Sequence, residues 1–187
     1  MDKPVVRTVM SLSLGGWLIG TILIAFVAAQ NFSVVDRLLA TSLHPAFHRD
    51  VGLLPAGEAR AMMRYLVSEQ NRLYFVWWGW AEAMLGLALL AMALRLKSGR
   101  MVLGFALMLA ITAAMQLYLT PRIVDVGRAL DFVPREPAPP SLRAFGILHA
   151  AYSSLDLIKL ALGAWMAWLL LRLPKSISPA GSQPGIA

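Results

Sequence analysis

Three ionisable side chains lie in the last apolar stretch of the chain, residues 141–173, at a spacing that places them on one side of a helix. They are His149, Asp156 and Lys159. At about 100° per residue, the same side of that helix also carries Tyr152, Ser153 and Gly163. An ionisable group at membrane depth is costly, so three on one stripe need partners or a water-filled cavity. The stripe therefore predicts a buried polar site that binds a small solute or an ion.

The partners come from two other apolar stretches. Glu82 shares its helix side with small residues, which predicts that its carboxylate points into a helix bundle. Counted from the stretch ends, Glu82 and Asp156 lie at the same depth and Lys159 is one turn away, so we expect these three to form a cluster. Gln116 matches His149 at a shallower depth, where we expect a second polar layer. The alternative is purely structural, because a buried Glu–Lys pair also fastens two helices together.

Composition indicates that these stretches are membrane spans. The 187-residue chain is 58% hydrophobic, and 14% of its residues are charged, against about 25% in a typical globular protein. We expect an all-α integral membrane protein, a four-transmembrane-helix bundle with an interfacial helix between the first two spans. Residues 1–175 form its single domain, and residues 176–187 form a disordered tail. The expected spans are residues 10–30, 73–94, 101–120 and 143–171.

The segments that connect the spans contain further polar residues. Gln30 and Asn31 end the first span, whose Gly16-x-x-x-Gly20 favours close approach of another helix. His44–Asp50 is predicted to be a loop, and a helix that opens at Pro55–Glu58 either lies at the interface or continues into the second span. The third span is predicted to stop at Pro121-Arg122, with Asp125 just beyond it.

An alternative exists for the first span, because Val27-Ala28-Ala29 resembles a signal-peptidase cleavage site. The apolar stretch of about 20 residues is longer than a usual signal core of about 7–15, which favours a retained span.

The basic residues predict the orientation and the location. Short segments at one end carry Lys3, Arg7, Arg95, Lys97, Arg100, Arg172 and Lys175, with Asp2 as the one acid. The positive-inside rule then puts both termini in the cytoplasm, in a bacterial inner membrane. The formal charge of +7 is explained by these flanks and by lipid headgroups, so we expect a lipid bilayer as partner and no nucleic acid.

Enzymatic chemistry is not favoured by the residues present. The chain has no cysteine, and it has no phosphate-binding loop, Ser-His-Asp order or zinc-ligand spacing. His44 and His48 have the i, i+4 spacing of metal ligands on a helix, but Pro45 interrupts that helix and further ligands are not evident. These two residues and His149 are the weak metal-ligand candidates of the sequence.

Several motifs resemble the family of transmembrane protein 205, a group of small four-helix membrane proteins that are mostly uncharacterised. They are Pro121-Arg122, Leu54-Pro55-Ala56-Gly57-Glu58-Ala59, and Phe145-x-x-x-His149-x-x-x-Ser153-x-x-Asp156-Leu157. The loop at residues 40–53 and Lys159 depart from the pattern. The wider group is similar to copper-resistance-D-like proteins, some of which bind haem through membrane histidines. That resemblance implies haem b as a cofactor, with His44 or His48 joining His149.

Three functions are therefore carried forward. The preferred one is binding or transport of a small solute or ion through the polar residues Glu82, Gln116, His149, Ser153, Asp156 and Lys159. The second is a haem- or metal-binding redox protein that uses His149. The third is a structural or assembly subunit, as a homo-oligomer or in a larger membrane complex, that uses the glycine-rich helix faces.

Overall fold

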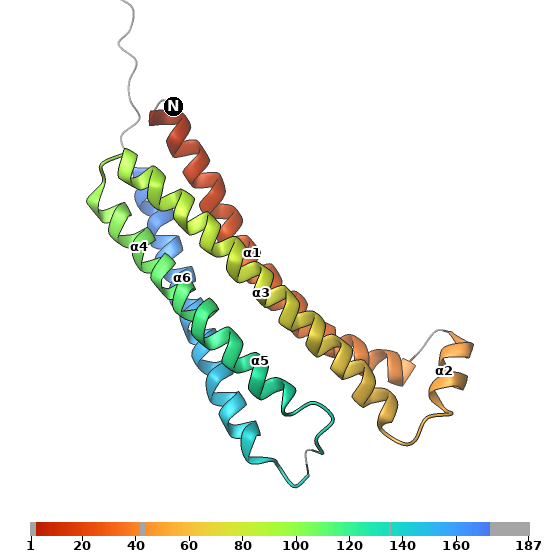
Figure 1. Cartoon of the computed structure of the whole chain (residues 1–187). Helices are drawn as coiled ribbons and strands as arrows, with labels where there is room; N and C mark the ends of the chain where they lie inside the picture. The colour runs from red at the N-terminus through yellow and green to blue at the C-terminus, as the bar shows by residue number, and fades with distance from the viewer. Residues whose placement is uncertain (1–2, 42–43, 135, 173–187) are drawn as a thin grey trace, which may run out of the picture.

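The computed structural model describes residues 3–41, 44–134 and 136–172, and all regular structure in these ranges is helical. Four long helical segments cover residues 4–41, 58–95, 99–128 and 140–172 of the described chain. They run side by side, with the short helix α2 at the end of α1 away from the N-terminus (Figure 1). The elements are α1 (Lys3–Thr41), α2 (Pro45–Val51), α3 (Glu58–Arg95), α4 (Gly99–Ala114), the π-helix η1 (Met115–Leu119), α5 (Thr120–Arg128) and α6 (Pro140–Arg172).

Four helices are long and apolar enough to cross a membrane, and they include the four expected spans. They cover residues 4–41, 58–95, 99–128 and 140–172. Only 22–33% of the most apolar window of each helix is buried inside the protein. A soluble bundle would bury its apolar face, so these outward-facing apolar surfaces match a lipid environment better than water.

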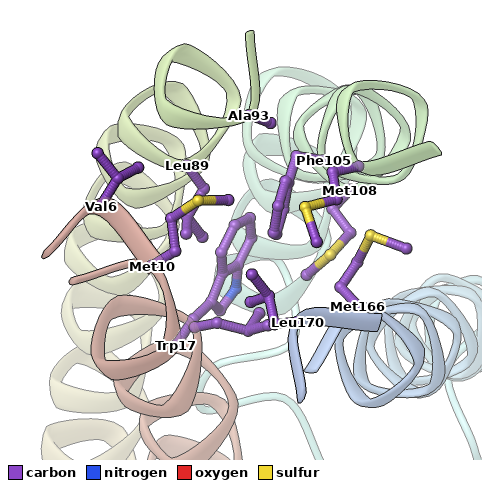
Figure 2. Packing of buried hydrophobic residues seen from close by; sticks show 11 residues of the cluster. Val6, Met10, Trp17, Leu89, Ala93, Phe105, Met108, Met166 and Leu170 are labelled. Carbon is purple, nitrogen blue, oxygen red and sulfur yellow. The ribbon is translucent and has the colours of Figure 1, made fainter. Parts of the chain in front are cut away.

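The tightest apolar packing lies at the end of the bundle that contains the N-terminus. Trp17 of α1 is at its centre and is 1% exposed, with methionine side chains from α1, α4 and α6 around it (Figure 2). The cluster consists of Val6, Met10, Leu14, Trp17, Leu89, Ala93, Met101, Phe105, Met108, Met166 and Leu170. This apolar core fixes all four long helices to one another at that end.

Small residues allow the helices to approach closely at several points. A Cβ atom added to Gly20 would meet the Trp78 indole, and one added to Gly79 would meet the Gln116 side chain. Gly16, the other glycine of the predicted packing motif, has nothing within 4 Å of such a Cβ. Only Gly20 of that pair therefore makes a close helix contact within the described chain.

The prediction of a loop at His44–Asp50 was wrong. Residues 45–51 form α2, in which Pro45 occupies the first turn. A proline is tolerated there because the first N–H groups of a helix have no intrahelical partner. The segment after Pro55 is the beginning of α3, which continues unbroken from Glu58 to Arg95.

The helix of the third span does not stop at Pro121, where that span was predicted to end. The helix continues through that proline to Arg128. It does so because η1 precedes it, in which the Thr120 N–H donates to the Met115 carbonyl instead of to a residue four positions back. A π-helical turn adds one residue to the helix, and such turns accommodate interruptions that would otherwise kink it. The predicted disordered tail, residues 176–187, lies outside the described residues.

Candidate functional site

The Glu82 carboxylate is buried inside the bundle and accepts hydrogen bonds from two other helices. Its Oε1 accepts from Trp17 Nε1 at 2.8 Å and from Thr21 Oγ1 at 2.9 Å, both on α1. Its Oε2 accepts from Lys159 Nζ of α6 at 2.6 Å. The Glu82 side chain is 2% exposed. Since buried charges need charged and hydrogen-bonding partners, both oxygens of this carboxylate are well satisfied.

Lys159 joins two carboxylates. Its Nζ lies 2.6 Å from Glu82 and 3.0 Å from Oδ1 of Asp156, which is one turn earlier on α6. The structure thus brings together the three residues that depth matching had grouped. Lys159 is 2% exposed, whereas the Asp156 side chain is 19% exposed. Asp156 is therefore the member of this charge triad (Glu82, Lys159 and Asp156) that reaches the surroundings.

Asp156 lines a cavity of about 360 Å³ between α1, α3, α5 and α6, a volume within the range of about 300–1,000 Å³ for small-molecule sites. Ala25 and Ala29 of α1 are exposed, as are His149 and Ser153 of α6, so the cavity opens between these two helices. The lining residues are Ala25, Ala28, Ala29, Phe32, Ser68, Asn71, Arg72, Phe75, Thr120, Ile123, Val124, Phe145, His149, Tyr152, Ser153 and Asp156.

The inward face of α6 runs from the cavity to the apolar core. Tyr152 and Asp156 line the cavity, and Lys159 follows one turn later at the charge triad. Beyond it, Gly163 is buried against Leu18 and Met108, and the face continues into the core. The charge triad thus lies at the boundary between cavity and core.

A hydroxyl at the cavity wall has no hydrogen-bond partner. Thr120 is 5% exposed and its Oγ1 makes no hydrogen bond within the described chain. The Tyr152 hydroxyl is in its vicinity but outside hydrogen-bond geometry. A buried polar atom without a partner costs about 1–3 kcal/mol, which a ligand that supplies the partner would remove.

The predicted polar layer of Gln116 and His149 divides between two surroundings. Gln116 lies in η1, where its Nε2 donates to the Val76 carbonyl of α3 at 3.0 Å and its side chain packs on Gly79. His149 lines the cavity and stacks on Phe145, with ring centroids 5.6 Å apart. Gln116 therefore acts in helix packing, and only His149 belongs to the cavity.

The polar residues at the helix ends do not line the cavity. Asn31 Nδ2 donates to Asn71 Oδ1 at 2.8 Å, and Asn71 in turn donates to the Ala28 carbonyl, which ties α1 to α3. Gln30 and Asp125 are exposed. The Arg122 guanidinium lies 5.7 Å from the centroid of the Tyr118 ring.

A second charge network, which sequence reasoning missed, connects α3 to the end of α5. Arg72 donates to both oxygens of Asp131, at 2.8 and 3.0 Å, and to Glu69 at 2.6 Å. Arg128 donates to both oxygens of Glu69 at 3.1 Å. The hydrogen bonds from Arg128 and Arg72 hold the pKa of the Glu69 carboxyl below its usual value, against the opposite effect of burial. Two acids and two bases make this outer network electrically neutral.

The three histidines do not assemble a ligand set. His44 caps α2 and His48 lies within it, whereas neither lines the cavity that contains His149. In the described ranges, no group of three His, Asp or Glu side chains is arranged to hold a metal ion. The haem hypothesis therefore has a single histidine in the cavity.

The sequence analysis also did not single out Trp17 and Thr21, the two α1 residues that donate to Glu82. Both lie in the first span, where a tryptophan and a threonine do not by themselves indicate a site. Their i, i+4 spacing places both donors on one side of α1. That spacing, together with the need of Glu82 for donors, was the signal that could have found them.

Comparisons of the chain with protein-family models, with curated proteins and with solved structures return no match. What the fold and the site themselves define is a class: an all-helical bundle with four helices long and apolar enough to cross a membrane, and among them a largely apolar cavity whose wall carries Asp156, Arg72 and His149. The resemblance to the transmembrane protein 205 family stays a prediction.

Proposed function

We propose that this chain is an integral membrane protein that binds a small solute in the cavity between α1, α3, α5 and α6. The observation that carries the proposal is the exposure of Asp156. Glu82 already has three donors, and Lys159 is held mainly by Glu82. Asp156 adds a second carboxylate that helix packing does not require, and it faces a cavity of ligand size.

The purely structural alternative accounts for one part of the charge triad. The Glu82–Lys159 pair joins α3 to α6 deep in the bundle, as a structural fastening would. It does not account for the partly exposed carboxylate of Asp156 on the cavity wall. We assign the pair to stability and the cavity wall to function.

The orientation forms part of the proposal. Arg95, Lys97 and Arg100 lie in or beside the α3–α4 turn, at the end of the bundle that also contains the N-terminus (Figure 1). With this basic end in the cytoplasm of a bacterial cell, the cavity belongs to the half of the bundle nearer the outer face of the inner membrane. The short helix α2 then lies at the outer face of the inner membrane.

Binding can be tested by blocking the cavity. Ala25→Phe places a ring at the α1 wall, and Ala150→Phe is the matched control, because Ala150 is exposed on α6 and does not line the cavity. Isothermal titration of the purified full chain in detergent would use three benzene-ring probes: benzyltrimethylammonium, benzenesulfonate and benzyl alcohol. At least one probe should bind the wild type and the control but not Ala25→Phe. Equal behaviour of the two variants toward every probe would exclude the cavity as a binding site.

A further inference from the structure

The charge balance of the cavity indicates which ligands it accepts. The charge triad contains two carboxyl groups and one ammonium, so it carries one negative charge when both carboxyl groups are ionised. Both Glu82 oxygens have donors, whereas only Oδ1 of Asp156 is bonded to Lys159. The surplus charge is therefore presented by Asp156, on the cavity wall.

Arg72, the arginine on the cavity wall, does not offset this charge. Arg72 is paired with Asp131 and Glu69, and Arg128 completes that network, which is neutral as a whole. An anion entering the cavity would compete with two carboxylates for the Arg72 guanidinium. The other ionisable side chains on the wall are Asp156, His149 and Tyr152.

Aromatic rings make up much of the remaining wall. Phe75 and Tyr152 meet edge to face, with ring centroids 5.6 Å apart, and Phe145 stacks on His149. The faces of such rings attract cations, and the effect is larger where water is excluded. The rest of the wall consists mainly of alanine, valine and isoleucine side chains, which suit an apolar body.

From these observations we infer that the cavity selects an organic cation, an amine or quaternary ammonium with an apolar body. This inference rests on the proposed function and deepens it. The cationic head pairs with Asp156 and contacts the rings of Tyr152 and Phe75, while the apolar body fills the space toward α1 and α5. An amine that carries an N–H has a further acceptor in the Thr120 hydroxyl, which is buried, unpartnered and part of the same wall.

The three probes named above distinguish this inference from the proposed function, because they share a benzene ring and differ in charge. Benzyltrimethylammonium should bind the wild type at least about tenfold more tightly than benzenesulfonate or benzyl alcohol. Asp156→Asn, which keeps the shape and removes the charge, should remove that preference. Asp156→Glu should retain it, and so should the control Ser154→Ala, whose hydroxyl bonds the Ala150 carbonyl of its own helix.

The outcomes separate cleanly. If benzenesulfonate or benzyl alcohol binds as well as the cation, and Ala25→Phe abolishes that binding, the charge selectivity is refuted and the cavity remains a binding site. If no probe binds the wild type, both ideas fail. The comparison of probes on the wild type and Ala25→Phe decides the matter even where Asp156→Asn does not accumulate.

Discussion

Lys159 of α6 lies 2.6 Å from Glu82 of α3, and both side chains are 98% removed from solvent. Such a pair is poor evidence of net stabilisation, because desolvation of two charges can cancel their attraction. Loss of one member is different, because it leaves the other charge buried and unpaired. Substitutions of these two residues therefore test whether the charge triad contributes to the stability of the bundle.

Lys159→Met should lower the free energy of unfolding by about 3–5 kcal/mol, less whatever protonation of a carboxylate relieves. Glu82→Gln/Lys159→Met should recover part of that loss, since the unpaired charge is gone. Thermal unfolding in detergent measures both. Strictly additive effects of the two single changes would show that the residues do not interact. Asp156→Asn should cost less than Lys159→Met, because Glu82 still neutralises the lysine.

The indole of Trp17 should contribute through its N–H as well as its packing. Trp17→Phe removes a 2.8 Å hydrogen bond to a buried carboxylate, a loss of about 1.5–3 kcal/mol. Trp78→Phe is the matched control, since its indole N–H donates to the neutral Thr21 hydroxyl at a longer 3.3 Å. Unfolding measurements should show the larger loss for Trp17→Phe. Equal losses would mean that the bond to Glu82 adds nothing to stability.

Two glycines should respond in opposite ways to the same substitution. Gly79→Ala drives a Cβ into the Gln116 amide, and overpacking of this kind costs about 1–3 kcal/mol. Gly16→Ala has nothing within 4 Å of the new atom, and an alanine there should be neutral or gain up to about 1 kcal/mol of helix propensity. A destabilising Gly16→Ala, measured the same way, would reveal a helix partner that contacts this face from outside the chain.

Reporter fusions would test the topology. A reporter that is active only in the cytoplasm should give signal when fused to the C-terminus and none when fused after Ala40. The reverse pattern would invert the bundle and place the cavity in the cytoplasmic half. Intact-mass measurement of the mature protein adds a second check, because cleavage after Ala29 would remove Trp17 and Thr21, two of the three donors to Glu82.

Hydropathy and residue depth were sufficient to place the four long helices and to group Glu82, Asp156 and Lys159. The effect of the prolines on the helices was harder to predict. A proline ends a helix only where the local structure does not compensate for its missing N–H donor. At Pro121 the π-helix compensates for it, and at Pro45 the first turn of α2 does. The cavity could not be derived from sequence, since it depends on the separation of α1 from the part of α6 that precedes Lys159.

The contacts of the aromatic and charged residues on the cavity wall could not be predicted from sequence either. Phe75 of α3 contacts Tyr152 of α6, and Arg72 of α3 pairs with Asp131, which follows α5. Both contacts join residues that are far apart in the sequence. Pairings of that kind depend on helix rotation. A rotation of one residue, about 100°, would turn Asp156 away from the cavity.

The apolar core around Trp17 separates the cavity from the end of the bundle that contains the N-terminus. A solute bound in the proposed site would have the charge triad on its core side, and beyond the triad lie Met10, Met108 and Met166, each fully buried. If the proposed site also serves transport, passage of a solute to the other side would require these methionines to move apart. Unbranched methionine side chains repack with little penalty. These three residues are therefore well suited to a part of the core that has to rearrange.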